Sequence, residues 1–168
     1  MNRVTEALEG KVIFLTGVTG FLGQPLVEKI LWLAPNVKKI YVLIRSKREL
    51  DNRLVTAQHR LEKEVFKSSV FERLREHHGA ETEPFLRKKL TAIPGDISNE
   101  KLGLTEDTYK KLCEEVDIVI SSGAVVSFDA PLDMAIEGNS LSAARMAEFA
   151  NACKGALLVH VSTAYVAV

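Results

Sequence analysis

Short runs of apolar residues alternate along the chain with longer stretches in which apolar residues recur at helical spacing. The run 12–15 is entered from polar residues and is followed by Thr16 and Gly17, as is typical of a strand buried on both faces of a parallel sheet. A helical stripe over residues 21–33 and a second apolar run over 40–44 come next. A strand, a helix and a strand in about 35 residues predict a βαβ unit, whose crossover is almost always right-handed.

The rest of the chain continues this alternation. Three further apolar runs predict strands, namely residues 90–93, 116–121 and 157–161. The charged segment 49–89 has sparse apolar positions and predicts one or two surface helices. Thr105 is expected to cap a helix that runs to residue 115, and another helix is expected over 132–152, where Gly138 could divide it. Five strands alternating with helices predict one doubly wound, Rossmann-like α/β domain over residues 1–168, with the strand order 3-2-1-4-5.

The composition is that of an ordinary globular domain, with 46% apolar and 26% charged residues among 168. Because 22 basic residues balance 22 acidic ones, nothing in the overall field attracts nucleic acid. Cys113 and Cys153 belong to no Cys/His grouping that could hold a metal, so both are expected to be reduced. The chain shows no signal-peptide core and no apolar run near the roughly 20 residues that span a bilayer. A cytoplasmic protein with a small-molecule partner is therefore expected.

Three glycines at a spacing of three lie between the first predicted strand and the first predicted helix. Gly17 would permit the tight turn, Gly20 would let backbone N–H groups reach a pyrophosphate, and Gly23 would let the helix lie close to the strand. The anion would then bind at the helix N-terminus. The alternative is a glycine-rich turn that binds nothing. The residues expected to contact a dinucleotide here are Thr16, Gly17, Thr19, Gly20, Phe21, Leu22 and Gly23.

The end of the second predicted strand indicates which dinucleotide is bound. A site specific for NAD places Asp or Glu there for the ribose hydroxyls, whereas this chain has Arg45, followed by Lys47 and Arg48. A guanidinium can bind a 2′-phosphate and stack on adenine, so Arg45 and Arg48 favour NADPH over NADH. The alternative is a solvated basic turn. Asp96, with Ile97 beside it, follows the third strand and is placed to meet the adenine edge, although a simple turn aspartate is nearly as good an interpretation.

These residues resemble those of the fatty acyl-CoA reductases and related thioester reductases, within the extended short-chain dehydrogenase/reductase superfamily. The glycine turn is the superfamily feature, and the resemblance extends over nearly the whole chain, including the long charged insert after Arg45. The segments that carry it are 10–17, 41–45, 69–75, 95–97, 102–104, 125–129 and 161–166.

The resemblance implies reduction of a fatty acyl-CoA to an aldehyde or an alcohol by hydride transfer from NADPH. The developing oxyanion must meet a hydrogen-bond donor. In this superfamily the donors are a Ser or Thr after the fifth strand and the Tyr of a later Tyr-x-x-x-Lys motif. By position Thr163 matches the catalytic hydroxyl residue, with Ser162 beside it at the cofactor, although a strand-end cap is the simpler interpretation of Thr163 alone. Asn139 matches an asparagine of the family in its helix, where a buried amide would need partners, and both a structural and an active-site role are open.

Two departures from the family pattern limit the comparison. The family usually has Asn-Ser-Ala-Ala, or a variant with His, after the fourth strand, where this chain has Ser121 followed by Ser122, Gly123 and Ala124. Backbone contacts of those last three residues with the nicotinamide side of the cofactor would survive this change. The Tyr-x-x-x-Lys motif is missing, and Tyr165 is not its tyrosine. The chain is therefore expected to be an N-terminal cofactor-binding part, incomplete at its C-terminus and not competent alone.

Two other functions fit the same pattern. A noncatalytic dinucleotide-sensing or scaffold module would also lack the Tyr-x-x-x-Lys motif. A sugar-nucleotide epimerase or dehydratase of the same superfamily is the other alternative, but the long charged insert and the segment 125–129 argue against it. An exposed sheet edge at the C-terminal side could promote self-association of the chain.

Overall fold

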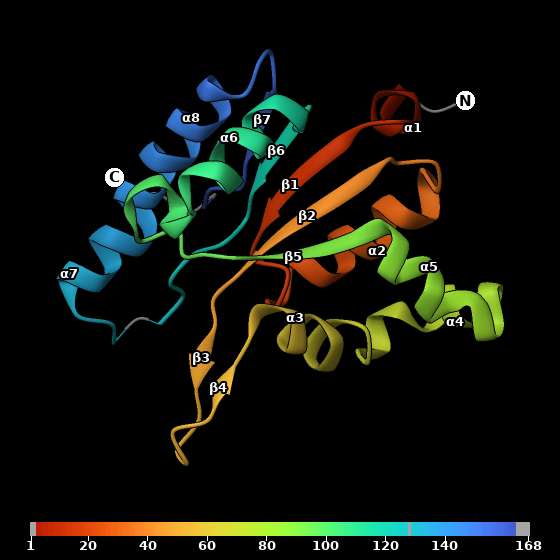
Figure 1. The fold of residues 1–168 in the computed structure, drawn as a ribbon, viewed down its shortest axis with the longest axis horizontal. Helices are drawn as coiled ribbons and strands as arrows, with labels where there is room; N and C mark the ends of the chain where they lie inside the picture. The colour runs from red at the N-terminus through yellow and green to blue at the C-terminus, as the bar shows by residue number, and fades with distance from the viewer. Residues whose placement is uncertain (1–2, 128, 164–168) are drawn as a thin grey trace.

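A computed structural model describes residues 3–127 and 129–163, which form one parallel sheet with helices on both faces (Figure 1). The strands of the sheet are β1 (Val12–Thr16), β2 (Lys39–Ile44), β5 (Leu90–Pro94), β6 (Ile118–Ser121) and β7 (Leu157–His160). Their spatial order is β5-β2-β1-β6-β7, and every neighbouring pair is parallel. The predicted order 3-2-1-4-5 is confirmed.

Helices cover both faces of the sheet, so β1 and β2 are buried on both sides, as their continuous apolar runs predict. One face is covered by α2 (Gly23–Leu33), α3 (Ala57–Arg60), α4 (Glu72–His78) and α5 (Thr82–Lys89). The other is covered by α6 (Glu106–Glu115) and α8 (Ser142–Ala152). Ile13 and Leu15 face the first core and Phe14 faces the second, where its ring lies 4.7 Å from that of Phe149.

The charged insert differs from its prediction in two ways. It begins with a hairpin, β3 (Lys47–Arg48) paired with β4 (Leu54–Val55), which projects from the body at the lower left of Figure 1. Its helices are also less superficial than expected, because Leu61, Phe71 and Leu86 are buried against the sheet. A π-helical turn (Leu61–Val65) and two 3₁₀ turns (Ser69–Phe71 and Gly79–Glu81) connect them.

Two further features differ from the predicted pattern. A short helix α1 (Arg3–Leu8) precedes β1, and α2 begins at Gly23, two residues after Phe21. The predicted helix over 132–152 is continuous, from α7 (Leu132–Ala135) through a π-helical turn (Ile136–Leu141) into α8. Gly138 does not divide it. A Cβ at Gly138 would overlap the side chain of Val125, so the glycine permits close packing instead. Thr105 caps α6 as predicted, accepting a hydrogen bond from the Thr108 N–H.

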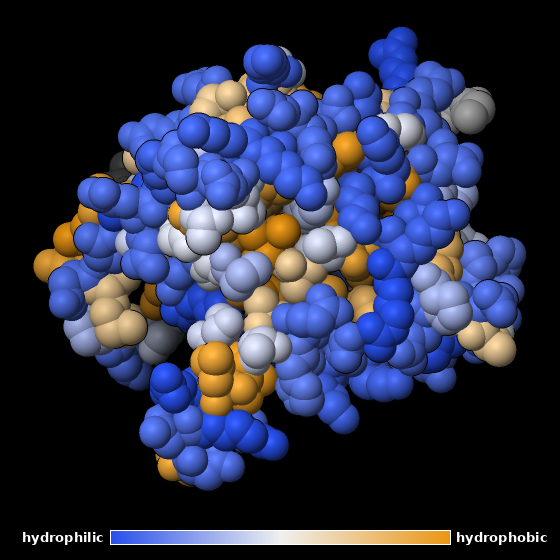
Figure 2. Space-filling view, in the orientation of Figure 1, coloured by the Kyte–Doolittle hydropathy of each residue, from blue (hydrophilic) through white to orange (hydrophobic). Residues whose placement is uncertain are grey.

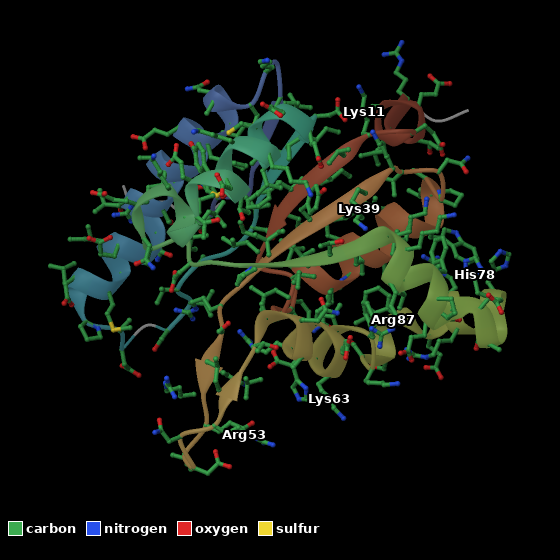
Figure 3. The ribbon with its side chains drawn as sticks, viewed as in Figure 1. Lys11, Lys39, Arg53, Lys63, His78 and Arg87 are labelled. Carbon is green, nitrogen blue, oxygen red and sulfur yellow. The ribbon has the colours of Figure 1, made fainter. Side chains whose placement is uncertain are left out.

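Hydrophilic residues cover most of the visible surface (Figure 2). Lys11 and Lys39 mark the amino ends of β1 and β2, whereas Arg53 marks the hairpin on the opposite side of the sheet (Figure 3). An apolar area lies over α7 at the left of Figure 2, where Leu132 and Met134 are exposed. Among the described residues, no helix is long and apolar enough to cross a membrane.

A substitution of Gly23 tests the packing of α2 on β1. A Cβ at Gly23 would overlap the carbonyl oxygen of Gly17, so Gly23→Ala is expected to lower the free energy of unfolding by at least about 3 kcal/mol, the upper end for overpacking. At Gly20 the nearest atom to an added Cβ is 3.2 Å away, so Gly20→Ala is the matched control and should cost much less. Urea unfolding of both variants checks this; equal losses would contradict the packing argument.

Candidate dinucleotide-binding site

The glycine turn brings the ends of two strands and the start of a helix into contact. Gly17 has a φ of +81°, a conformation that L side chains rarely adopt, and a Cβ there would lie 2.8 Å from the Ser122 carbonyl oxygen. Gly23, the first residue of α2, is buried against Gly17. Both predicted roles, the tight turn and the close helix packing, are therefore confirmed.

The start of α2 has no side chain that caps it. The N-cap residue is Leu22, whose side chain cannot accept a hydrogen bond, and Phe21 before it is 98% exposed. Among the described residues, the backbone N–H groups of Phe21 and Leu22 make no hydrogen bond. Uncapped N–H groups and the positive end of the helix dipole favour an anion at this position. The start of α2 is therefore the candidate position for a diphosphate.

Thr16 and Ser122 join the exits of β1 and β6. The Thr16 side chain is buried, and its Oγ1 accepts hydrogen bonds from the N–H groups of Ser122 (3.1 Å) and Gly123 (3.0 Å). The Ser122 hydroxyl in turn donates to the Thr16 carbonyl oxygen at 2.6 Å. The Thr16 side chain thus ties the residues that follow β6 to the end of β1. Gly123 lies against Gly17 and Ile97, and Ala124 beyond it is exposed.

Arg45 and Asp96 lie together at the ends of the neighbouring strands β2 and β5. A guanidinium nitrogen of Arg45 is 3.6 Å from a carboxylate oxygen of Asp96, and the Arg45 side chain is 67% exposed. The other carboxylate oxygen of Asp96 accepts a hydrogen bond from the Ser98 N–H at 2.9 Å. The sequence selected both residues, and the parallel register of β2 and β5 brings them to one edge.

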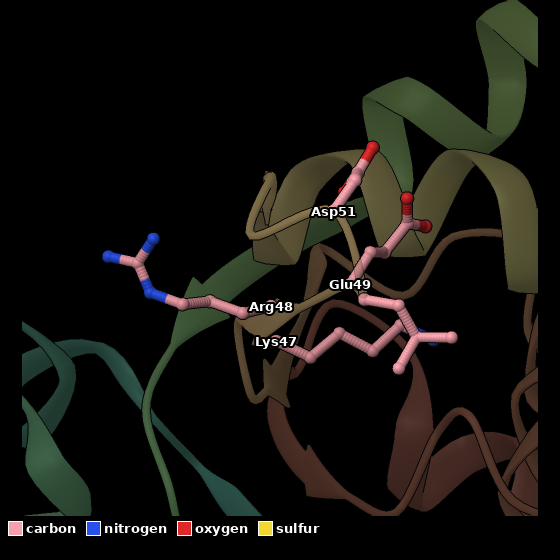
Figure 4. A pocket seen from close by; sticks show the side chains of 5 residues that line it. Lys47, Arg48, Glu49 and Asp51 are labelled. Atoms are coloured by element: carbon pink, nitrogen blue, oxygen red, sulfur yellow. The ribbon is translucent and has the colours of Figure 1, made fainter.

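Arg48 lies further out, on the hairpin. Its guanidinium donates to the carbonyl oxygen of Asn52 at 3.1 Å, and its side chain points away from the other labelled side chains in Figure 4. The hollow shown there is lined by Lys47, Arg48, Glu49, Leu50 and Asp51, so it belongs to the hairpin and not to the glycine turn.

Arg60 is a residue of this edge that sequence reasoning missed. It donates to the carbonyl oxygen of Arg45 at 2.8 Å, and it binds both carboxylate oxygens of Glu64 at 2.8 and 2.7 Å. The Arg60 guanidinium, assisted by Lys47 at 3.2 Å, lowers the pKa of the Glu64 carboxyl. The spacing of Arg60 and Glu64, four residues apart, was the one available signal, but it indicates only a pair on a helix. The contact with Arg45 is not readable from the sequence.

Asn139 holds the loop that follows β6. Its amide oxygen accepts from the Val125 N–H at 2.8 Å and its amide nitrogen donates to the Val125 carbonyl oxygen at 3.0 Å. The residue is exposed, so the expectation of a buried amide was wrong, although both amide groups do have partners. A structural role for Asn139 is therefore present.

The residues after β7 are described only in part. Ser162 and Thr163 are exposed and directly follow Val161, whose N–H donates to the Ser121 carbonyl oxygen at 2.9 Å. Thr19 lies half-buried in the glycine turn. Phe128, Tyr165 and Val166, which belong to the segments of the predicted resemblance, lie outside the described residues.

The two cysteines are not suited to nucleophilic chemistry. Burial raises the pKa of the Cys153 thiol to about 12 and raises that of Cys113 as well. Both thiols are therefore protonated at neutral pH.

A family model described as Male sterility protein, an NAD-binding domain, matches residues 15–168. The chain belongs to this family. It is 42% identical to Fatty acyl-CoA reductase 1 of Arabidopsis thaliana over 98% of the chain and 33% of the relative. It is 38% identical to the Alcohol-forming fatty acyl-CoA reductase of Simmondsia chinensis, over 99% of the chain and 33% of that protein. The chain thus spans about a third of these relatives.

Solved structures agree with this assignment. The terminal R domain of the myxalamid PKS-NRPS biosynthetic pathway superposes with a TM-score of 0.70 at 29% identity, covering 91% of this chain and 35% of the other. The male sterility family domain therefore binds a nicotinamide dinucleotide. One relative, 39% identical over 97% of the chain and 26% of its own length, is Fatty acyl-CoA reductase 2, chloroplastic, of Arabidopsis thaliana, so a cytoplasmic location stays a prediction.

Thr16 gives a direct test of how the crevice of this male sterility family domain is held. Thr16→Val keeps the side-chain shape but removes the oxygen that accepts from two N–H groups, and should cost about 1–3 kcal/mol of unfolding free energy. Thr16→Ser keeps that oxygen and is the control. Hydrogen exchange at the Ser122 and Gly123 amides should accelerate in Thr16→Val only; equal exchange in both variants would refute the tie.

Proposed function

We propose that this chain is the NADPH-binding part of a fatty acyl-CoA reductase, which reduces an acyl thioester to a fatty aldehyde or alcohol. The names of the relatives support the reaction, and the placement of one side chain supports the cofactor. Arg45 directly follows β2, at the edge where the uncapped start of α2 also lies. Among the described residues at this edge, a cation thus stands where an NAD site has its carboxylate.

The diphosphate would bind the first turn of α2. Gly20 is exposed, and the free N–H groups of Phe21 and Leu22 can donate to phosphate oxygens. Since these donors belong to the backbone, they distinguish neither NADPH from NADH nor one reductase from another. The same holds for the N–H groups near Ser122, Gly123 and Ala124, which we assign to the nicotinamide side.

The 2′-phosphate would bind Arg45. Its guanidinium is largely exposed, while Arg60 holds the Arg45 carbonyl oxygen and so fixes where the side chain leaves the strand. A charge-assisted pair with a phosphate is about twice as strong as a neutral hydrogen bond. Asp96 and Ile97 would border the adenine, and Arg48 would approach from the hairpin when its contact with Asn52 opens.

At the reacting end, NADPH supplies the hydride. Thr163 would donate a hydrogen bond to the thioester oxygen as negative charge develops there, with Ser162 beside it at the cofactor. Asn139 would keep the loop after β6 in place through Val125, and would contact the cofactor only through that loop.

A noncatalytic dinucleotide sensor is the second candidate, and one observation favours it. The donors described at the glycine turn are backbone groups, which can hold a diphosphate without any hydride transfer. Such a module would bind dinucleotide through the same backbone donors and transfer no hydride.

Cofactor choice is tested with Arg45→Gln. NADPH affinity should fall about tenfold, the loss expected for one charge-assisted phosphate contact. NADH affinity should change less than twofold, because NADH lacks the 2′-phosphate. Fluorescence titration of both cofactors measures this. Lys38→Gln removes the same charge beside the amino end of β2 and is the control. Equal NADPH and NADH affinities in the unsubstituted chain would contradict the NADPH assignment.

A chimera separates the enzyme from the sensor. This chain would be joined to the polypeptide that follows the matched region of the Simmondsia chinensis reductase. We expect NADPH oxidation that depends on acyl-CoA, with Thr163→Ala lowering kcat by roughly 10²-fold or more and Ser162→Ala lowering it far less. A chimera that binds NADPH but does not turn over would support the sensor, as would turnover that is unaffected by Thr163→Ala.

A further inference from the structure

The ion pair between Arg45 and Asp96 places an anion beside the group that is to bind a phosphate. Among the described residues, Asp96 is the one side-chain partner of the Arg45 guanidinium, at 3.6 Å. The other cations nearby are already engaged: Arg60 and Lys47 by Glu64, and Arg48 by Asn52. Arg45 is thus the cation of this edge that can exchange one anion for another.

Several hydrogen bonds hold Asp96 in place. The backbone N–H of Asp96 donates to the Leu102 carbonyl oxygen at 2.8 Å, and its backbone carbonyl accepts from the Asn99 N–H at 3.1 Å. In the side chain, Oδ1 accepts from the Ser98 N–H. Oδ2 is the oxygen that faces Arg45. Asp96 is therefore fixed at both its backbone and one carboxylate oxygen.

An unusual turn maintains this arrangement. Lys101 and Leu102 have φ values of +48° and +59°, in the left-handed region that side chains with a Cβ rarely adopt. Each such residue costs roughly 1–2 kcal/mol, and the burial of Leu102 in the core offsets part of it. The Leu102 carbonyl lies so close to Gly95 that no side chain fits there. The left-handed turn at Lys101 and Leu102 thus places the Leu102 carbonyl oxygen where it accepts from the Asp96 N–H.

We propose that Asp96 is a specificity-determining residue that competes with the 2′-phosphate for the Arg45 guanidinium. This inference rests on the proposed function. Without a 2′-phosphate, the Arg45–Asp96 pair persists, so a nucleotide such as NADH loses nothing at this position. A 2′-phosphate must displace Asp96 from the guanidinium before it gains its own contact. Asp96 therefore moderates the preference for NADPH and keeps Arg45 oriented over the adenosine site.

The test uses the 168-residue chain and two probes that differ only in the 2′-phosphate, 2′,5′-ADP and 5′-AMP, in calorimetric titrations. Both probes carry adenine, so any contact of Asp96 with the base cancels in the ratio of the dissociation constant of 5′-AMP to that of 2′,5′-ADP. Asp96→Asn keeps the acceptor for the Ser98 N–H and removes the charge. We expect 2′,5′-ADP to bind about three- to fivefold more tightly, the size expected when an exposed ion pair is released. The affinity for 5′-AMP should stay within about twofold.

A double-substitution cycle with Arg45→Gln shows whether Asp96 acts through Arg45. In the Arg45→Gln background, Asp96→Asn should leave the ratio unchanged; the same rise there would mean direct repulsion of the phosphate and would overturn the proposal. Glu76→Gln, on α4, removes an acidic charge elsewhere and should have no effect. An unchanged or lowered ratio in Asp96→Asn alone also overturns it. If Arg45→Gln leaves the ratio unchanged, or if neither probe binds, the proposed function fails instead.

Discussion

The contact between the first residue of α2 and the carbonyl of Gly17 is the constraint on which the whole edge of the sheet depends. Gly23 has no Cβ, so the helix starts directly against the exit of β1. Its uncapped N–H groups therefore lie beside the strand ends. A larger residue would move the helix outward and separate its positive end from Arg45. The Thr16 hydroxyl adds a second constraint, because it holds the exit of β6 against the same turn.

The charges around Arg45 follow from this arrangement. In the proposed site, the backbone donors of α2 would hold any diphosphate, so selectivity would come from side chains at the end of β2. Each cation in this region has a partner within the protein. Lys47 and Arg60 pair with Glu64, and Arg48 donates to Asn52. The fourth cation, Arg45, pairs with Asp96. An edge balanced in this way avoids a strong unspecific attraction for anions. In the proposed site, binding of a 2′-phosphate would therefore exchange one partner of Arg45 for another.

The sequence predicted the elements whose signal is local. Continuous apolar runs gave the five strands and their order, and the glycine spacing gave the turn, because both depend on neighbouring residues. The hairpin was missed because its strands are two residues long and lie within a charged segment. Gly138 left a division of its helix open in the sequence, because the reason for a glycine there is Val125, in a loop 13 positions earlier. The bond from Arg60 to Arg45 joins residues whose proximity only the fold creates.

Two π-helical turns lie next to residues that hold the ends of strands. Leu61–Val65 directly follows Arg60, which holds the carbonyl at the end of β2, and the wider turn leaves the Glu64 carbonyl to accept a hydrogen bond from Gln24 of α2 at 3.3 Å. Ile136–Leu141 contains Asn139, which holds Val125 after β6. In each case a residue in or next to the π-helical turn binds the backbone of a residue that follows a strand, Arg45 after β2 and Val125 after β6. Such turns are common at functional sites because they redirect side chains or carbonyls without ending the helix. In the proposed site, the adenosine side and the nicotinamide side would thus each be bordered by a helix that departs from regular geometry where it meets a loop.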